Sequence, residues 1–388
     1  MTGMRWPSWA RWSEGAGRYY TVGVEEEVML LDPSDYSLSE SSDGVLGRLS
    51  RELAAHMRPE THAAVVELAT GIHVQVAVAV AELAALRSRL SRELREMGIA
   101  VASAGMHPLA AARETRVSGS ERYRMVADSM RSLANREPTL ALHVHVGVPD
   151  PDDAVRLLNG LRPAVPVLLA LSANSPFSRG RDTGFASART VIFQAFPRTG
   201  TARRFADYAD YVRSIEPLIA SGGLPDPSFL WWDVRLQPAL GTVEIRVMDA
   251  QSTLTDTAAL IALVQSLARL VLEGEAIGED VGPEVLAENR FLAARDGLQA
   301  RLIDPGKGAL TPIRTLIEEL LTRCHPHAAA LGCSSELDRV QQLADANGAV
   351  RQREWAEEAG LTKLMSTLTA CFPAGCESLG EPARRVGR

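Results

Sequence analysis

Four short stretches of the chain alternate hydrophobic with polar positions at the period of two that is typical of β-strands, and a fifth, residues 63–70, is an apolar run broken by the single carboxylate of Glu67. They cover residues 21–31, 63–70, 139–148, 231–238 and 242–249. In each stretch one face is apolar, whereas the other face carries ionisable side chains. Because successive side chains of a strand point to opposite faces, one antiparallel sheet would gather these groups on a single surface. The pattern therefore predicts a sheet with one packed face and one face that lines a cavity.

Helical spacing of apolar residues predicts helices between and after these strands. The expected helices cover residues 45–56, 74–97, 120–133, 152–171, 255–272, 283–295, 311–323 and 336–344. A short apolar strand is expected at residues 99–104, and a long polar loop at residues 174–189. Strands that are dispersed among helices and followed by an all-helical last third indicate an α+β fold with an antiparallel sheet.

The ionisable face of the predicted sheet is rich in carboxylates. Glu25 and Glu27 share this face of the first strand, whereas Glu26 falls on the apolar face. Five residues would supply oxygen ligands and one imidazole: Glu25, Glu27, Glu67, His143 and Glu244. Mostly carboxylate ligation suits Mg²⁺ or Mn²⁺ better than zinc. The negative charge of this many carboxylates exceeds the positive charge of a single divalent ion. We therefore expect more than one ion together with a polyphosphate, which indicates ATP.

Arginines on the same strands agree with a phosphate ligand. Arg246 follows Glu244 on the same face, and a planar guanidinium binds phosphate oxygens through two hydrogen bonds. Each residue alone has an ordinary explanation. A carboxylate pair such as Glu25 and Glu27 is commonly a solvated face, and Asp233 with Arg235 suits a surface ion pair worth under about 1 kcal/mol. The recurrence over five strands favours the ligand interpretation.

Composition narrows the function classes. The chain has 388 residues, of which 46% are hydrophobic and 23% charged, as in soluble globular proteins. A net charge of -7 argues against a nucleic-acid partner, which needs a basic face. No apolar run reaches about 18 residues, and the N-terminus lacks the apolar core of a signal peptide. The four cysteines, Cys324, Cys333, Cys371 and Cys376, are expected to be thiols in a reducing cytoplasm.

Taken together, the strand segments resemble the carboxylate–amine ligase family, also called type 2 glutamate–cysteine ligases. The resemblance is carried in order by GVEEEVMLLDP, VVELATG, ERYR, HVHVG, LSANSPF, GRDTGFASAR, FPRTG, WDVRLQP, GTVEIRVMDAQSTL and NRF. These motifs cover nearly the whole chain from about residue 21. The expected organisation is a flexible arm over residues 1–20, a single catalytic domain over residues 21–372 and a flexible tail over residues 373–388.

The resemblance implies a glutamine-synthetase-like catalytic fold, in which curved antiparallel strands form a funnel for ATP and two or three Mg²⁺ ions, with Mn²⁺ as a substitute. It implies that ATP phosphorylates a carboxylate, by family precedent the γ-carboxylate of L-glutamate. An amine such as L-cysteine then displaces phosphate to give an amide, ADP and phosphate. Small molecules would be the partners, and a homodimer is the family-level expectation.

Carried over position by position, the resemblance also implies residue roles. The metal positions are Glu25, Glu27, Glu67, His143 and Glu244, with Glu60 as a sixth. The catalytic positions are Arg246 and Glu244, and the nucleotide is expected to meet Arg246, Arg235 and His143. The substrate-binding positions are His145, Arg189 and Asp233.

Two other functions compete with this interpretation. One is a zinc metallohydrolase that uses the HVHVG strand, and it predicts bound zinc and activity without ATP. The other is a non-catalytic relative that binds a nucleotide or an amino acid. The chain also departs from the family at Met106, where relatives carry Thr, and in the alanine-rich segment that follows. Because side chains around the metal funnel select the substrates, these departures leave the amine and the carboxylate open.

Overall fold

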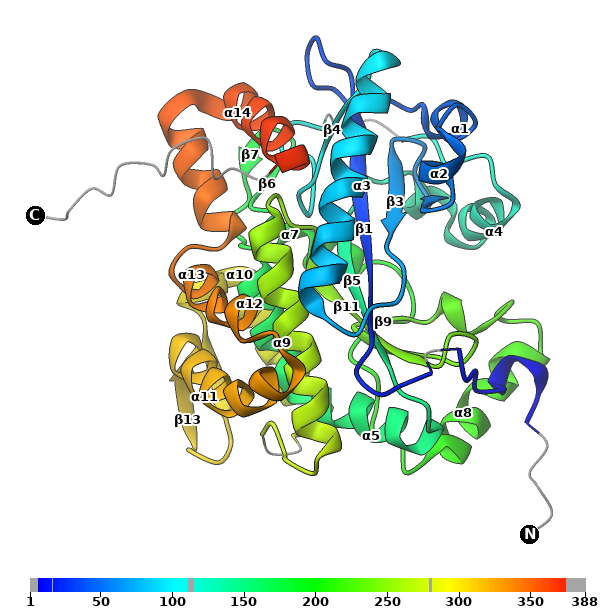
Figure 1. The fold of residues 1–388 in the computed structure, drawn as a ribbon, viewed down its shortest axis with the longest axis vertical. Helices are drawn as coiled ribbons and strands as arrows, with labels where there is room; N and C mark the ends of the chain where they lie inside the picture. Colours follow the sequence, from blue (N-terminus) through cyan, green and yellow to red (C-terminus); the bar gives the residue numbers. More distant parts are fainter. Residues whose placement is uncertain (1–5, 16, 111–114, 279–280, 375–388) are drawn as a thin grey trace, which may run out of the picture.

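The computed structural model describes residues 6–15, 17–110, 115–278 and 281–374. In this part of the chain, seven strands form one antiparallel sheet with the order β10-β11-β5-β1-β3-β2, and β4 pairs with β1. The strands of this sheet are β1 (Val22–Leu31), β2 (Met57–Pro59), β3 (Val65–Ala69), β4 (Ala100–Ala102), β5 (Ala141–Gly147), β10 (Val234–Gln237) and β11 (Thr242–Asp249). The three longest strands, β1, β5 and β11, are neighbours and therefore form the centre of the molecule (Figure 1).

Helices surround the sheet and make up most of the chain after β11 (Figure 1). They are α1 (Ser42–Leu46), α2 (Arg51–Ala54), α3 (Val76–Glu96), α4 (Glu121–Met130), α5 (Pro151–Leu161), α6 (Val165–Ser172), α7 (Ala188–Phe193), α8 (Tyr208–Ala220), α9 (Leu254–Leu272), α10 (Pro283–Asp296), α11 (Ile313–Leu331), α12 (Ser334–Asp338), α13 (Val340–Asp345) and α14 (Gly348–Ala374). Three two-stranded pairs lie outside the main sheet: β6 (Phe177–Ser178) with β7 (Arg181–Asp182), β8 (Thr199–Gly200) with β9 (Trp231–Trp232), and β12 (Arg301–Asp304) with β13 (Ala309–Pro312).

The apolar face of the sheet packs against α3 and α9, which lie side by side in front of it in Figure 1. Val22, Val24 and Val28 of β1 belong to the main hydrophobic core, together with leucines from both helices. The burial of this face fixes the register, because a shift by one residue would turn Glu25 and Glu27 into the core. The polar face is thereby held towards the cavity.

Glu26 is the exception on the apolar face, and the structure supplies its partner. Arg87 of α3 donates Nε and Nη2 to the two carboxylate oxygens of Glu26, at 2.7 and 2.6 Å, and both side chains are fully buried. The Thr257 hydroxyl of α9 donates a third bond at 3.0 Å. One carboxylate therefore connects β1 to both covering helices.

The sequence-based elements are confirmed in type for four of the five strands and for α3, α4, α9, α10 and α11. The expected strand at residues 231–238 is divided into β9 and β10, and the expected helix at residues 336–344 into α12 and α13. The expected helix at residues 45–56 is instead two short helices, and the one at residues 152–171 is divided into α5 and α6 around Pro163 and Pro166. The β12–β13 hairpin and α14, which bends at Gly360, were not predicted. The expected loop at residues 174–189 contains the β6–β7 hairpin.

Within the segment expected to be a flexible arm, the described tryptophans Trp6 and Trp12 contact the domain. Trp12 Nε1 donates to the carbonyl oxygen of Val148 at 2.8 Å, and the ring of Trp6 packs edge-on against Tyr208. Cys324 and Cys333 are free, as expected, whereas Cys371 is disulfide-bonded, so the expectation of thiols is wrong at Cys371. Of the expected flexible tail, residues 375–388 lie outside the described residues.

Two helical stretches, Pro151–Ser172 and Leu254–Leu272, are long and apolar enough to cross a membrane. However, 78% and 83% of the most apolar part of these two stretches is buried inside the protein. Burial of this extent is what core helices of a folded domain show, so their apolar character is explained by packing against the sheet.

Candidate active site

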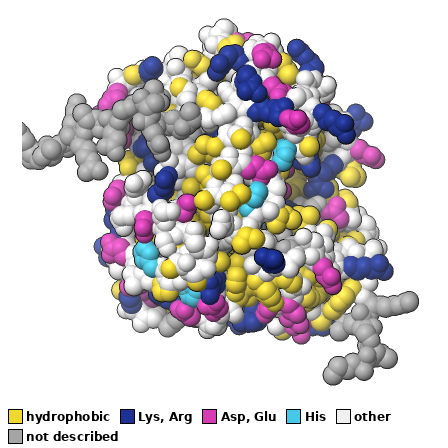
Figure 2. Space-filling model, viewed as in Figure 1, with side chains coloured by type: hydrophobic (Ala, Val, Ile, Leu, Met, Phe, Trp, Pro, Cys, Tyr) yellow, Lys and Arg dark blue, Asp and Glu magenta, His cyan; other side chains and the backbone are white. Residues whose placement is uncertain are grey.

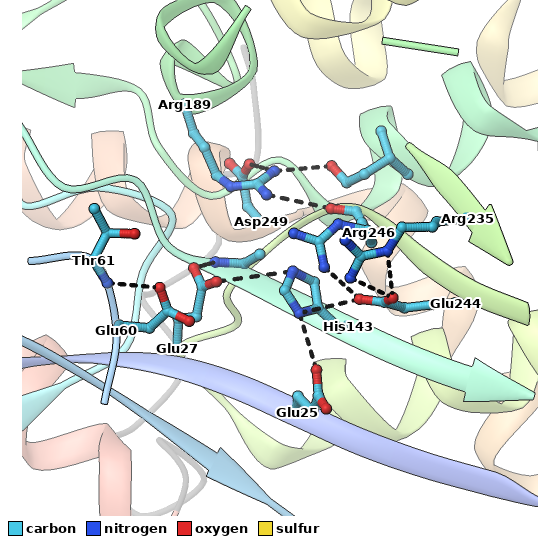
Figure 3. A network of polar contacts seen from close by, with 12 residues as sticks. Glu25, Glu27, Glu60, Thr61, His143, Arg189, Arg235, Glu244, Arg246 and Asp249 are labelled. Carbon is cyan, nitrogen blue, oxygen red and sulfur yellow. Dashed lines mark hydrogen bonds and ion pairs between the residues drawn. The ribbon is translucent and has the colours of Figure 1, made fainter. Parts of the chain in front are cut away.

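The register of the central strands brings the predicted ligands together on the polar face of the sheet. Glu25 of β1 lies opposite His143 of β5, and Glu27 lies opposite Glu67 of β3. On the other side of β5, His145 lies opposite Glu244 of β11. Directly opposed residues in antiparallel strands are near enough for their side chains to meet. Figure 3 shows Glu25, His143 and Glu244 pointing towards one another from these strands.

Three side chains form the first group of candidate metal ligands, namely Glu25, His143 and Glu244, with ligand atoms within 4.8 Å of one another. His143 Nδ1 lies 3.3 Å from Glu25 Oε2 and 3.8 Å from Glu244 Oε1. Oxygen ligands on one Mg²⁺ are about 3 Å apart, because each lies about 2.1 Å from an octahedral ion. The spacing therefore fits one small hard cation.

A second group consists of Glu27, Glu67 and His143, again within 4.8 Å of one another. Here His143 Nε2 lies 3.9 Å from Glu27 Oε1. His143 is thus common to both groups, and its Nε2 is buried without a hydrogen-bond partner among the described residues. Burial and the nearby Arg246 lower the pKa of His143 to about 4, which keeps the imidazole in its neutral, metal-binding form.

The carboxylates differ in their electrostatic state. Burial, followed by the charge of Glu60, raises the pKa of Glu27 to about 8. Burial and neighbouring carboxylates raise the pKa of Glu67 still more clearly, and burial also raises the pKa of Glu60. Burial acts on Glu25 in the same direction, but His145 and His143 outweigh it and lower the pKa. Repulsion of this kind among carboxylates is relieved by a bound cation, so the donor set fits Mg²⁺ or Mn²⁺.

Glu60 lines the cavity but belongs to neither of these groups. Its Oε2 accepts a hydrogen bond from the backbone N–H of Thr61 at 2.9 Å, and the Tyr123 hydroxyl lies 3.2 Å from its Oε1. The structure therefore brings the sixth predicted ligand to the cavity, and the neighbouring Tyr123 was not among the predicted site residues.

Two arginines neutralise Glu244. Arg235 donates Nε and Nη2 to Glu244 Oε2 at 2.9 and 2.7 Å, and Arg246 Nη1 pairs with Oε1. Burial would raise the pKa of Glu244, but the charges of Arg235 and Arg246 hold it well below the usual value. Both arginines line the cavity, and Arg246 Nε is buried without a partner among the described residues. Arg246 therefore has a donor left for a ligand.

A β-bulge in β11 determines where Arg246 points. The pairing with β5 shifts between Ile245 and Met248, so Arg246 and Val247 lie in the irregular segment. Arg189 of α7 donates to the carbonyl oxygens of both, at 3.2 Å for Arg246 and 3.1 Å for Val247. Bulges next to active sites commonly re-aim a side chain. Arg189, which also lines the cavity, thus holds the segment that carries Arg246.

Two predicted substrate-binding residues lie outside this cavity. Asp233 accepts two bonds from Arg290, at 2.9 and 3.1 Å, and a third from the Thr201 hydroxyl, so its carboxylate is already occupied. His145 lies 3.4 Å from Glu25 but lines a second cavity, and its Nδ1 is 3.0 Å from the Thr242 hydroxyl. Among the predicted substrate-binding positions, only Arg189 reaches the main cavity.

The main cavity has a volume of about 560 Å³. Its described lining includes side chains that the sequence reasoning did not propose: Arg58, Arg122, Tyr123, Phe193, Phe196 and Trp231. Arg122 and Tyr123 lie in the ERYR motif, and Phe196 lies in FPRTG. The family motifs therefore pointed to these residues, although the motifs alone assigned them no role in the site. A second cavity, of about 260 Å³, also contacts Glu25. It extends along β1 towards Gly23 and Thr21, whereas the main cavity extends towards Glu27.

Solved structures share this fold. A glutamate–cysteine ligase from Francisella tularensis, crystallised in complex with AMP, matches with a TM-score of 0.65 and 14% identity over 92% of this chain and 90% of that chain. A bifunctional glutathione synthetase from Pasteurella multocida matches with a TM-score of 0.66 and 14% identity over 91% of this chain and 51% of that chain. The chain therefore has the fold of these ligase structures, and the expected α+β fold with an antiparallel sheet is confirmed.

Sequence comparisons identify the family. The family described as glutamate–cysteine ligase family 2 matches residues 21–363. A Rubrobacter xylanophilus protein named "Putative glutamate--cysteine ligase 2-3" is 42% identical over 351 residues, which are 90% of this chain and 96% of that protein. A Thermobifida fusca protein of similar name is 34% identical over 95% of this chain. The chain therefore belongs to glutamate–cysteine ligase family 2, whose members are carboxylate–amine ligases.

Proposed function

We propose that the protein is an ATP- and Mg²⁺-dependent ligase that joins the γ-carboxylate of L-glutamate to an amine such as L-cysteine through an acyl phosphate. The observation that carries the proposal is the pair of ligand groups that share His143 on the floor of the cavity, directly beside Arg246. Two adjacent cation sites with an arginine form the arrangement that phosphoryl transfer uses to neutralise phosphate charge.

In the proposed reaction, a carboxylate oxygen of the amino acid attacks the γ-phosphorus of ATP, and the bond to the bridging oxygen of ADP breaks. The amine nitrogen then bonds to the acyl carbon as the carbon–oxygen bond to phosphate breaks, and an amine proton leaves to solvent. Mg²⁺, when bound, would neutralise the phosphate charge in both steps. Glu25 and Glu244 would hold one ion, and Glu27 and Glu67 a second, with Glu60 next to it. His143 lies between the two positions and would ligate one of the ions, because a neutral imidazole offers a single lone pair.

The arginines of the cavity have distinct roles in this proposal. Arg246 would donate from its free Nε to the transferred phosphoryl group, since no described residue accepts this bond. Arg235 contacts Glu244 through two donors and would keep that carboxylate ionised and fixed. Arg189 would act on the reaction through the backbone of the bulge.

The competing functions find less support. A zinc hydrolase would favour a site with several histidines. In each candidate ligand group among the described residues, His143 is the single histidine and the other two ligands are glutamates. A non-catalytic relative would have no need for a complete ligand set beside an arginine with a free donor.

ADP release with Mg²⁺, ATP, L-glutamate and a panel of amines, with products read by mass spectrometry, tests the proposal. We expect ADP and an amide of matching mass to appear together. Glu67→Gln should abolish turnover, whereas the control Glu357→Gln, which changes an exposed residue of α14, should retain it. ATP consumption by the Glu67→Gln protein at the wild-type rate would refute the assignment of this ligand.

The proposed reaction involves only small molecules. Figure 2 shows arginine and lysine interspersed with acidic side chains on the visible face, and the net charge is -7.

We propose a homodimer in the cytoplasm, as the family resemblance suggests. Analytical ultracentrifugation and cell fractionation test these two statements.

A further inference from the structure

Three aromatic rings form a continuous row along one wall of the main cavity. They belong to Phe193 at the end of α7, Phe196 just after it and Trp231 of β9, and all three line the cavity. The ring centroids of Phe193 and Phe196 are 5.5 Å apart, and those of Phe196 and Trp231 are 6.4 Å apart. We call these three residues the aromatic wall.

Two arginines pack against the ends of the aromatic wall. The guanidinium of Arg198 lies 5.1 Å from the ring of Trp231, and its Nε donates to the carbonyl oxygen of Phe229 at 3.0 Å. At the other end, the Arg189 guanidinium lies 5.8 Å from the ring of Phe193. Nevertheless, all three side chains of the wall keep intermediate exposure, because part of each borders the cavity. The wall is therefore a preformed apolar surface beside reactive groups.

The second cavity offers a separate place for the base of ATP. Among the described residues that line it, apolar and small side chains such as Ile72, Leu240 and Gly71 predominate, and no arginine or lysine is present. Along β1, Glu25 separates this cavity from the main one, which contacts Glu27 as well. In-line phosphoryl transfer places the leaving ADP and the attacking carboxylate on opposite sides of the phosphorus. Two cavities that meet at Glu25 suit the approach of the nucleotide and the amino acid from different sides.

With the base in the second cavity, the main cavity receives the amino acid and the amine. Its cationic lining, including Arg122 and Arg58, suits the carboxylates of the amino acid. With the base of ATP in the second cavity, neither glutamate nor the phosphates bring an apolar group to the aromatic wall, and the short thiol-bearing side chain of cysteine would cover little of it. An apolar surface of this kind gains binding energy from an apolar group that displaces its water.

We propose that the amine substrate carries an aromatic or large apolar group that packs on the aromatic wall, so that the preferred acceptor is an aromatic amine or amino acid. This inference rests on the proposed ligase function. The amine nitrogen would still form the amide as phosphate leaves, and the apolar group would only position it. Contacts of this kind contribute to kcat/KM through selective binding of one acceptor over another.

Matched acceptors test the proposal directly. With saturating ATP and L-glutamate, we expect kcat/KM for 2-phenylethylamine to exceed that for ethylamine about 10- to 100-fold, and phenylalanine to exceed cysteine. ADP release and amide formation without this preference would overturn the inference but leave the ligase function intact. No ADP release with any amine would instead refute the proposed function itself.

Variants locate the preference in the wall. Phe196→Leu should raise the KM for the aromatic amine about tenfold, leave the KM for ATP unchanged and have little effect on ethylamine. The control Phe291→Leu changes an exposed phenylalanine outside the cavity and should have no effect on any of the three. A rise in the KM for ATP instead would show that the wall holds the base. A second measurement uses the Trp231→Leu protein in the presence of a non-hydrolysable ATP analogue. In a calorimetric titration, this variant should bind 2-phenylethylamine more weakly than the wild-type protein does.

Discussion

Substitution of Arg87 by methionine should strongly destabilise the protein, because it leaves the carboxylate of Glu26 buried without its cation. Arg87 donates two hydrogen bonds to Glu26 and one, at 2.9 Å, to the carbonyl oxygen of Gln251. After the substitution, only the Thr257 hydroxyl would remain as a hydrogen-bond donor to this carboxylate among the contacts described above. The substitution keeps most of the apolar stem and removes the charge.

The expected loss is about 3–5 kcal/mol in the free energy of unfolding, which is the usual cost of removing one partner of a buried pair. The double variant Glu26→Leu with Arg87→Met should recover most of this loss, because apolar residues of similar volume commonly replace a buried ion pair at little cost. The coupling energy of the double-mutant cycle should therefore be large, about 3 kcal/mol.

Urea unfolding followed by circular dichroism measures these differences. Arg95→Met is the matched control, since Arg95 is an exposed arginine on the same helix, and its effect should stay within about 0.5 kcal/mol. A loss below about 1 kcal/mol for Arg87→Met would refute the role of Arg87 as the partner of Glu26. A double variant that is no more stable than Arg87→Met would refute it as well. Either result would mean that Glu26 does not depend on Arg87 as its partner.

Three further predictions concern the site. Because the pKa of Glu27 is raised from 4.5 to about 8 in the metal-free protein, its stabilising contribution is present below pH 4.5 and is lost as the pH rises through about 8. A cation must displace this proton, so calorimetry should find Mn²⁺ affinity increasing with pH through about 8, and Glu27→Gln should weaken the dependence. Part of it should remain, because the pKa of Glu67 is also raised. Arg189→Lys should lower kcat about tenfold with an unchanged circular dichroism spectrum, because lysine cannot hold both bulge carbonyls; wild-type kcat would contradict this role. Asp233→Asn should destabilise the protein by about 3 kcal/mol in urea, since it breaks the buried pair with Arg290. A raised substrate KM without loss of stability would instead support the substrate role that the sequence suggested for Asp233.

The alternating pattern predicted the central sheet well, because a strand with one buried face must place its residues at a period of two. Glu26 violated this pattern, and the violation was explained only by Arg87, which follows 61 positions later. The break between α5 and α6 depends on prolines whose effect on a helix varies with context. The β12–β13 hairpin and α14 carry no strong local pattern, so only tertiary packing defines them.

The site was predictable to the extent that its residues share one face of the sheet. Glu25, Glu27, Glu67 and His143 meet as the strand alternation requires. Asp233 lies at the bend between β9 and β10 rather than within a strand, and Arg290 from a later helix occupies its carboxylate. No periodicity could reveal such a partner. The aromatic wall was missed for a similar reason, since α7 and β9 meet there only through the fold.

The order in which the site residues are synthesised has a consequence for the newly made chain. Glu25 and His143 are 118 positions apart, and His145 and Thr242 are separated by another 97. A growing chain therefore carries the carboxylates of β1 long before it has β11 to complete the sheet. Such distant pairing slows folding and leaves strand edges open meanwhile. A fragment that ends before β11 would lack Glu244 and Arg246, so premature termination would yield a protein with an incomplete sheet and without part of the proposed first ion site.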